Sequence, residues 1–285
     1  MSKNSNLKDD FKLISYKRRN KKVANKFKLK ENIAKNTTAY NKETAIRRIH
    51  EAKQDILLSD LYSSLLASLR ESQSALLDPQ IQDIICLGLG RIGECTVARY
   101  QLGLLLCLRD LFKVKVSIFD PVFTEIENDL LTELECQVLH KNVEGKYVTE
   151  KTTLFFLPHC PKQLANNLLW ANWGLNLSNC IIIANSFSNL LERNTKRSIR
   201  ENAAYILNIS PYTLEIAVIN MFKYYDVFND LAVHVFPYKN LCLISGDFWK
   251  YNHEPKYLSD DIEFITNKLN ELYQVSYLLS FLRRY

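Results

Sequence analysis

Apolar and polar positions follow two different periods along the chain. Between Thr44 and Leu77, apolar side chains recur every three or four residues, which predicts a helical segment with one buried face. Ser59-Asp60 indicates a break into two helices, and Asp78-Pro79 ends the segment. From Asp83 onward, short apolar runs alternate with longer amphipathic ones, which is the pattern of strands joined by helices.

The short apolar runs predict six strands, over 84–87, 115–119, 137–139, 153–157, 180–184 and 232–236. Helices are predicted between them, over 92–112, 123–135 and 162–170 and within 187–207. Runs that are apolar throughout are typical of strands covered on both faces. The sequence therefore predicts an α/β fold with a doubly wound, mainly parallel, Rossmann-like sheet.

Charge divides the chain into a tail and one domain. Residues 1–30 hold 11 basic side chains and two acids. The net charge of this region is therefore more positive than the +6 of the whole chain, so the remaining residues together are mildly acidic. Few apolar residues lie in this region, and we predict a basic, disordered tail over 1–36. A single α/β domain is predicted over 37–285, with a helical segment at 40–77, a core at 81–240 and a C-terminal helical segment at 258–284.

These features limit the classes of partner. The longest apolar run, 102–108, is far shorter than the ~20 residues that span a bilayer, so we expect no membrane segment. No basic face with aromatic side chains follows the tail, which argues against sequence-specific nucleic-acid recognition by the fold. Seven cysteines without a CxxC pair indicate reduced thiols in a cytoplasmic or nuclear protein. The basic run 17–22 fits either a nuclear import signal or a solvated arm.

A glycine-rich turn is the first candidate binding element. The predicted strand 84–87 ends in Gly88-x-Gly90-x-x-Gly93, and such a turn before a helix offers backbone N–H groups to a phosphate or carboxylate. Asp120 follows the next strand, where a carboxylate can bind ribose hydroxyls. Each feature has a plain alternative: the glycines as a packing turn, and Asp120 as the cap of the following helix.

Polar residues also follow two later strands: His159 and Cys160 after 153–157, and Asn185 and Ser186 after 180–184. Because ligands bind outside the carboxyl ends of parallel strands, we expect these groups to converge on one crevice. The predicted cofactor-binding residues are Gly88, Gly90, Asp120, His159, Asn185 and Ser186. The predicted ligand is of nucleotide type, S-adenosylmethionine or NAD.

His159 is the candidate for acid–base chemistry, although no catalytic residue is identified. Adjacent residues on an extended segment point in opposite directions, so His159 and Cys160 do not form a nucleophile–base pair. Cys160-Pro161 also fits a dipeptide of haem-responsive proteins in which a thiolate binds ferric iron, which makes haem an alternative ligand. The other histidines lack metal-ligand spacing, and no metal site is predicted.

Several short motifs occur in order between about residues 81 and 240, more than half of the chain. They are Gly88-x-Gly90, Ala98–Leu102, Phe119–Phe123, Asn142–Lys146, Phe155–Cys160, Asn166–Trp173, Asn185–Phe187 and Phe228–Pro237. Together they closely resemble the Sensitivity to Red Light Reduced family, the SRR1-like domain proteins. The chain departs from the family in having Gly93, which favours a turn that needs only the first two glycines.

The resemblance implies a regulatory protein in the cytoplasm, the nucleus or both. Plant relatives are tied to light input into the circadian clock, and animal relatives to haem biosynthesis and clock-gene expression. It implies no catalytic residues. Two functions therefore remain open: a regulator that acts through protein partners or a small ligand, and an enzyme that uses S-adenosylmethionine or NAD in the same crevice.

Overall fold

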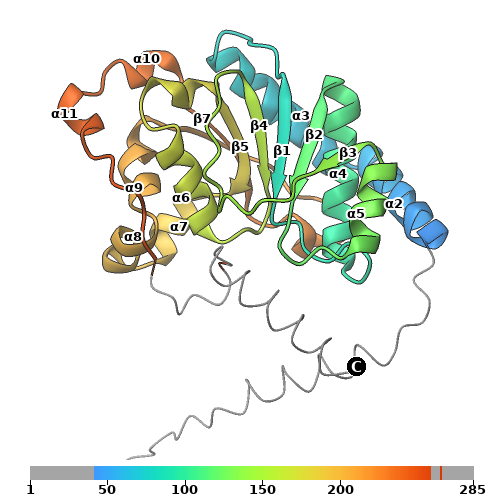
Figure 1. Ribbon diagram of the computed structural model, residues 1–285. Coiled ribbons are helices and arrows are strands. Elements are labelled where there is room, and N and C mark those ends of the chain that lie inside the picture. Colours follow the sequence, from blue (N-terminus) through green and yellow to red (C-terminus); the bar gives the residue numbers. More distant parts are fainter. Residues whose placement is uncertain (1–41, 258–263, 265–285) are drawn as a thin grey trace, which may run out of the picture. The chain divides into compact units, whose positions relative to one another are not determined.

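A computed structural model describes residues 42–257 and Phe264. The predictions of a disordered tail over 1–36 and of a C-terminal helical segment over 258–284 lie, Phe264 apart, outside these residues. The described part contains a seven-stranded sheet with helices on both faces (Figure 1).

The strands occur in the sheet in the order β3-β2-β1-β4-β5-β7-β6. Their bounds are β1 Asp83–Leu87, β2 Lys115–Phe119, β3 Cys136–Val138, β4 Thr153–Leu157, β5 Cys180–Asn185, β6 Leu214–Ala217 and β7 Leu231–Val235. The first five strands are parallel, whereas β7 runs antiparallel to both β5 and β6. The predicted α/β class with a mainly parallel, doubly wound sheet is confirmed.

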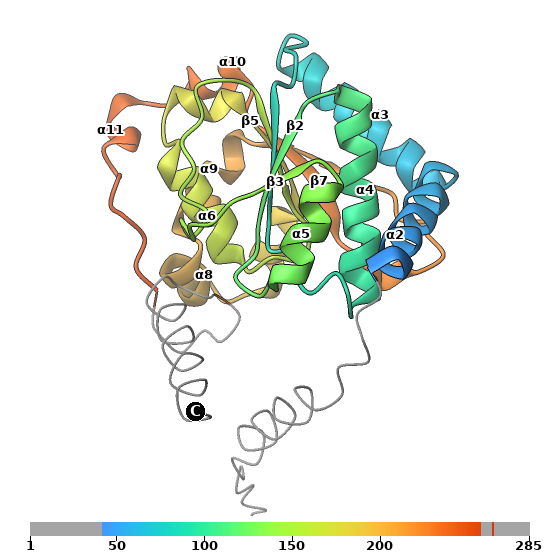
Figure 2. The ribbon, with the colours of Figure 1, turned by 45° about the vertical axis from the view of Figure 1, so that its right-hand side comes forward.

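Two groups of helices cover the sheet (Figure 2). One face carries α2 Lys42–Leu57, α3 Asp60–Ala75, α4 Thr96–Phe112 and α5 Glu125–Glu133. The other face carries α6 Lys162–Ala171, α8 Lys196–Asn202 and α9 Ala204–Ile209. Short elements complete the described chain: η1 Leu175–Asn179, α7 Phe187–Arg193, η2 Ser210–Tyr212, η3 Tyr225–Val227, α10 Tyr238–Leu241 and α11 Gly246–Trp249.

The predicted helical segment before the sheet forms α2 and α3 and breaks where expected. Ser59 caps α3, its hydroxyl accepting the Tyr62 N–H at 3.3 Å. α2 lies directly against α4, where a Cβ on Gly103 would come within 3.0 Å of the Lys53 backbone nitrogen. The N-terminal helices are therefore packed into the α/β domain.

All residues of β4 and β7 are buried, and only the last residue of β5 is not. Strands with helices on both faces bury every side chain, which explains their continuous apolar sequences. The carboxyl ends of the parallel strands consequently present their following loops at one rim of the sheet.

The structure differs from the predicted elements in two places. β6 was not predicted, because it has four residues, contains Glu215 and is half-exposed at the sheet edge. α4 begins at Thr96 rather than near residue 92, so the glycine motif ends in a turn before the helix.

Candidate functional site

The turn after β1 depends on two glycines. Gly88 and Gly90 have φ of +72° and +83°, a region that residues with a Cβ rarely adopt. Gly93 is not among the residues with positive φ, so the turn needs two glycines rather than three. Gly88 also approaches the β4–α6 turn closely: a Cβ at this position would lie 2.6 Å from the Sγ of Cys160.

Asp120, directly after β2, connects this turn to the neighbouring strand. Its carboxylate accepts the Gly90 N–H at 2.7 Å and the Val122 N–H at 2.9 Å. Burial raises the pKa of Asp120, and the two backbone hydrogen bonds oppose that shift. Asp120 does not cap α5; Thr124 does so, in a capping box with Glu127.

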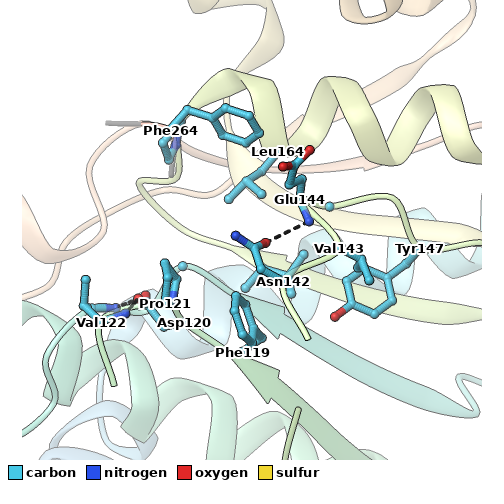
Figure 3. Close-up of a pocket in the computed structure, with 15 residues that line it drawn as sticks. Phe119, Asp120, Pro121, Val122, Asn142, Val143, Glu144, Tyr147, Leu164 and Phe264 are labelled. Atoms are coloured by element: carbon cyan, nitrogen blue, oxygen red, sulfur yellow. Dashed lines mark hydrogen bonds between the residues drawn. The ribbon is translucent and has the colours of Figure 1, made fainter. Parts of the chain in front are cut away.

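A cavity of about 210 Å³, here called the first cavity, opens beside these groups. Figure 3 shows Asp120, Pro121 and Val122 on one side of it and Val143 and Tyr147 on another, with Phe119 and Phe264 at opposite ends. Its lining comprises Leu87, Gly88, Gly90, Phe119–Val122, Asn142–Gly145, Tyr147, Pro161, Leu164 and Phe264. The first cavity therefore lies at the ends of β1 and β2, next to β4, where the chain reverses its direction of progress across the sheet.

One side of the first cavity is formed by the segment after β3, which the sequence singles out only through the motif Asn142–Lys146. Buried amide side chains of α6 hold this segment: Asn167 donates to the Glu144 carbonyl at 2.7 Å, and Asn172 donates to the Tyr147 carbonyl at 2.7 Å. Gly145, with φ of +82°, lies so close to Leu164 that a Cβ would come within 2.6 Å of its carbonyl oxygen. The available signal in the sequence was that the segment follows the end of a strand.

His159 is exposed and lines neither the first cavity nor a second cavity at the ends of β4 and β5. Its backbone has φ of +55°, its N–H donates to the Asn185 side chain at 2.9 Å, and its Nε2 lies 3.1 Å from the Val227 carbonyl. These contacts join the turn after β4 to the ends of β5 and η3. The geometry gives His159 a positioning role for this turn.

The thiol of Cys160 and the ring of His159 contact different backbone carbonyls, and His159 lies in a turn rather than on the extended segment that the sequence predicts. The thiol donates to the Leu87 carbonyl at 3.0 Å. Burial raises the pKa of Cys160 well above its ordinary value, and the Asp120 carboxylate adds to the shift. A neutral, hydrogen-bonded thiol is a poor nucleophile and a poor ligand for haem iron.

Asn185 and Ser186 lie at the end of β5. Ser186 caps α7, accepting the Asn189 N–H at 3.0 Å, and donates to Glu215 on β6. Burial acts to raise the pKa of Glu215, but hydrogen bonds and charge from His234, Ser186 and Ser188 lower it to about 2. These residues thus join α7 to β6 and β7.

A second cavity of about 310 Å³ lies at the ends of β4 and β5. Its lining comprises Leu157, Cys160–Gln163, Ala165, Ala184–Phe187, Leu190, Arg193, Asn194, Ile206 and Asp230. The expectation of one crevice is therefore corrected: Gly88, Gly90 and Asp120 line the first cavity, whereas Asn185 and Ser186 line the second. Pro161 lines both, because the β4–α6 turn passes between them.

The described residues include no group of three or more His, Cys, Asp or Glu side chains that could hold a metal ion. Nor does any helix within 42–257 have the length and apolar character needed to cross a membrane. The groups available for ligand binding are thus backbone amides, side-chain amides, a few charges and apolar surface.

Residues 57–235 match the SRR1 domain. The chain belongs to the SRR1 domain family. Two SRR1-like proteins extend the match: that of Mus musculus is 35% identical over 202 residues, covering 59% of this chain and 81% of the relative. The SRR1-like protein of Drosophila melanogaster is 28% identical over 246 residues, covering 83% of this chain and 86% of the relative. The resemblance to this family found in the sequence is thereby confirmed.

The SRR1 domain also matches the Arabidopsis thaliana protein SENSITIVITY TO RED LIGHT REDUCED 1, at 35% identity over 114 residues, covering 39% of this chain and 41% of the relative. Among solved structures, the plantazolicin methyltransferase BamL, crystallised with a triazolic desmethylPZN analog and SAH, is 14% identical. That match has a TM-score of 0.25 and covers 58% of this chain and 66% of the other. The fold assignment of this SRR1 domain therefore rests on its own strand order.

Proposed function

We propose that this SRR1 domain protein is a regulatory protein that binds a nucleotide-type ligand in the first cavity and acts through protein partners. The observation that carries the proposal is the junction of Gly88, Gly90 and Asp120 at one cavity beside the β1–β4 boundary. The buried carboxylate of Asp120, whose oxygens can accept further hydrogen bonds, and the apolar walls suit a ribose and an aromatic base. In keeping with the family resemblance, the regulated process is circadian clock input or haem biosynthesis, in the cytoplasm or nucleus.

The lining of the first cavity supports binding rather than covalent catalysis. Its ionisable side chains are Asp120, Glu144 and Tyr147. Asp120 already accepts two backbone hydrogen bonds, Glu144 pairs with Lys146, and burial raises the pKa of Tyr147 to about 12. A nucleophile activated by a neighbouring base and an orienting third group is not found among them.

An enzyme that uses S-adenosylmethionine or NAD in the same cavity is the alternative. The strand order favours it, because the chain reverses its direction across the sheet beside β1, and nucleotide cofactors bind in the crevice at such a point. Methyl transfer needs chiefly positioning of the two reactants, so it does not require a nucleophile in the protein. A shared fold alone does not fix an activity, and this reading remains second.

Thermal unfolding with S-adenosylmethionine or NAD tests the proposal. A ligand present at about 100 times its Kd adds about 2.7 kcal/mol of stability, which raises the Tm by several degrees. We expect Val143→Trp, which fills the first cavity, to abolish the shift. Val148→Trp is the matched control, because Val148 lies on the same segment, is 68% exposed and does not line the cavity.

Three outcomes decide between the readings. A shift lost in Val143→Trp and kept in Val148→Trp, with the ligand recovered unchanged, supports the regulator. Conversion of the ligand during incubation, such as release of S-adenosylhomocysteine, supports the enzyme. No shift with either ligand at millimolar concentration overturns binding of a nucleotide-type ligand in the first cavity.

A further inference from the structure

The second cavity has a buried apolar part that the first proposal does not use. Leu157, Ala184, Phe187 and Ile206 line it, and each of these side chains is at most 5% exposed. They come from β4, β5, α7 and α9, which are elements of the packed core. These buried side chains fix the base of the cavity, and the half-buried Pro161 and Leu190 supply apolar surface that a ligand's hydrocarbon body can cover.

The charged residues at this cavity do not cancel. Arg193 lies 3.9 Å from Asp230, whose carboxylate also accepts from the Asn189 side chain, so these charges offset one another. Lys162 is half-buried and forms no ion pair with any carboxylate of the described residues. The first turn of α6, which begins at Lys162, contains no acidic residue. Within the described part of the chain, one positive charge at the edge of this cavity therefore has no counter-charge.

Neutral hydrogen-bonding groups surround this charge. The amide side chains of Asn185 and Asn194 and the hydroxyl of Ser186 also line the cavity. Several of their atoms are already engaged: Asn185 accepts the His159 N–H, and Asn194 donates to the Leu190 carbonyl. Lys162 is consequently the group best able to form a new charge-assisted hydrogen bond.

We propose that the second cavity binds a small monoanionic ligand: a carboxylic acid on an aromatic or branched aliphatic body. The carboxylate pairs with Lys162, and the body covers Pro161 and Leu190. Such a ligand would lie beside a nucleotide-type ligand, separated from it by the Pro161 turn. Because Lys162 does not line the first cavity, this inference stands or falls independently of the proposed function.

Two probes of nearly equal shape isolate the contribution of charge. Naphthalene-2-acetate carries the carboxylate, and 2-naphthaleneacetamide has the same apolar body without the charge. We expect isothermal titration to show about tenfold tighter binding of the acetate to the wild-type protein, as one charge-assisted hydrogen bond provides. Lys162→Gln should bring the two affinities together.

Two further variants keep the test decisive. Lys196 is an exposed lysine on α8 that lines neither cavity, so Lys196→Gln should keep the tenfold preference. Leu190→Trp, which fills the second cavity from α7, should weaken both probes equally. Near-ultraviolet circular dichroism confirms that each variant is folded. Equal affinities for both probes in the wild type, a preference that survives Lys162→Gln, or no binding at millimolar concentration overturns the proposal.

Discussion

Gly88, Gly90 and Gly145 share a positive φ, but their surroundings differ. Around Gly90 the nearest atom to an added Cβ is 3.9 Å away, so only the backbone conformation calls for glycine. At Gly88 the obstacle is the Cys160 side chain, at 2.6 Å, and at Gly145 it is the Leu164 backbone, at 2.6 Å. The sequence identifies the glycine turn at 88–90, whereas the neighbours of Gly88 and Gly145 come from α6 and the turn before it.

Alanine substitutions separate these two causes. We expect Gly90→Ala to lower the free energy of unfolding by about 1 kcal/mol, the cost of a left-handed backbone with a Cβ. Gly88→Ala should cost about 2–3 kcal/mol, because the new Cβ also meets the Cys160 sulfur. Urea denaturation measures both values.

The double variant Gly88→Ala/Cys160→Ala is the control for the steric part. It should lose less stability than the sum of the single variants, since the obstructing sulfur is gone. Strict additivity would show that the close approach of Cys160 is not what requires glycine at this position.

At the level of elements, α6 determines the shape of the first cavity. Its C-cap residue Asn172 is 1% exposed and bonds to three backbone groups: the Thr149 N–H and the carbonyls of Tyr147 and Leu168. Together with Asn167, it fixes the 142–149 segment that lines the cavity. The asparagines are visible in the sequence, but their partners lie more than 20 residues away and could not be predicted from local patterns.

Asn172→Ala tests this role. Two buried backbone groups, at Tyr147 and Thr149, lose their partner, so we expect a loss of about 2–4 kcal/mol in urea denaturation. Amide hydrogen exchange should become faster within 142–149. Asn202→Ala removes a side chain that bonds only within its own helix, to Ser198, and should cost less than 1 kcal/mol. Equal effects of the two substitutions would contradict a bracing role for Asn172.

Element prediction succeeded where packing reinforces the local pattern. β1, β4 and β5 are continuous apolar runs covered on both faces, and their predicted and observed bounds differ by at most one residue. β6 has neither advantage, because its four residues are only partly buried and its ladder depends on β7. A strand defined by its partner is not visible in its own sequence.

For the molecule as a whole, Glu215 connects β6 and β7 at the edge of the sheet to the start of α7, which follows β5. From β6 it accepts hydrogen bonds from Ser186 and Ser188 at the start of α7, and it lies 3.5 Å from Nε2 of His234 on β7. Burial opposes ionisation of Glu215, yet the groups around it lower its pKa from 4.5 to about 2. The ionised carboxylate therefore stabilises the folded state.

The contribution of the Glu215 carboxylate to stability depends on pH in a definite direction. Since the folded pKa lies below the unfolded one, the stabilisation is complete above about pH 4.5 and is lost as the pH falls toward 2. We expect Glu215→Gln to lower stability at pH 7 by about 1–2 kcal/mol, after allowance for solvent screening of a partly exposed group. The loss should shrink as the pH is lowered through this range.

Urea denaturation at a series of pH values between 7 and 2 provides the measurement. Glu201→Gln is the matched control, because Glu201 is paired only with exposed Arg197 within one helix. Its curve should follow that of the wild type. If the curve of Glu215→Gln also stays parallel to the wild type, the carboxylate is not held in its ionised form by the fold.

The rule that ligands bind outside the carboxyl ends of parallel strands placed the candidate groups at the correct rim of the sheet. It predicted one cavity, whereas the structure has two. It identifies which loops meet, and Gly88, Gly90 and Asp120 do meet. The division into two cavities depends on the path of the Pro161 turn, which follows from the left-handed backbone of His159 and its bonds to Asn185 and Val227. Such long-range side-chain contacts leave no periodic trace in a sequence.

The reversed strand β7 has a consequence for the order of events during synthesis. β6 leaves the ribosome before β7, yet its only hydrogen-bonded neighbour in the described sheet is β7. Residues 214–217 must therefore wait, unpaired, until residues 231–235 have emerged and docked on β5. The edge strand β6 is therefore synthesised early, but it can join the sheet only after β7, a later segment, has paired with β5.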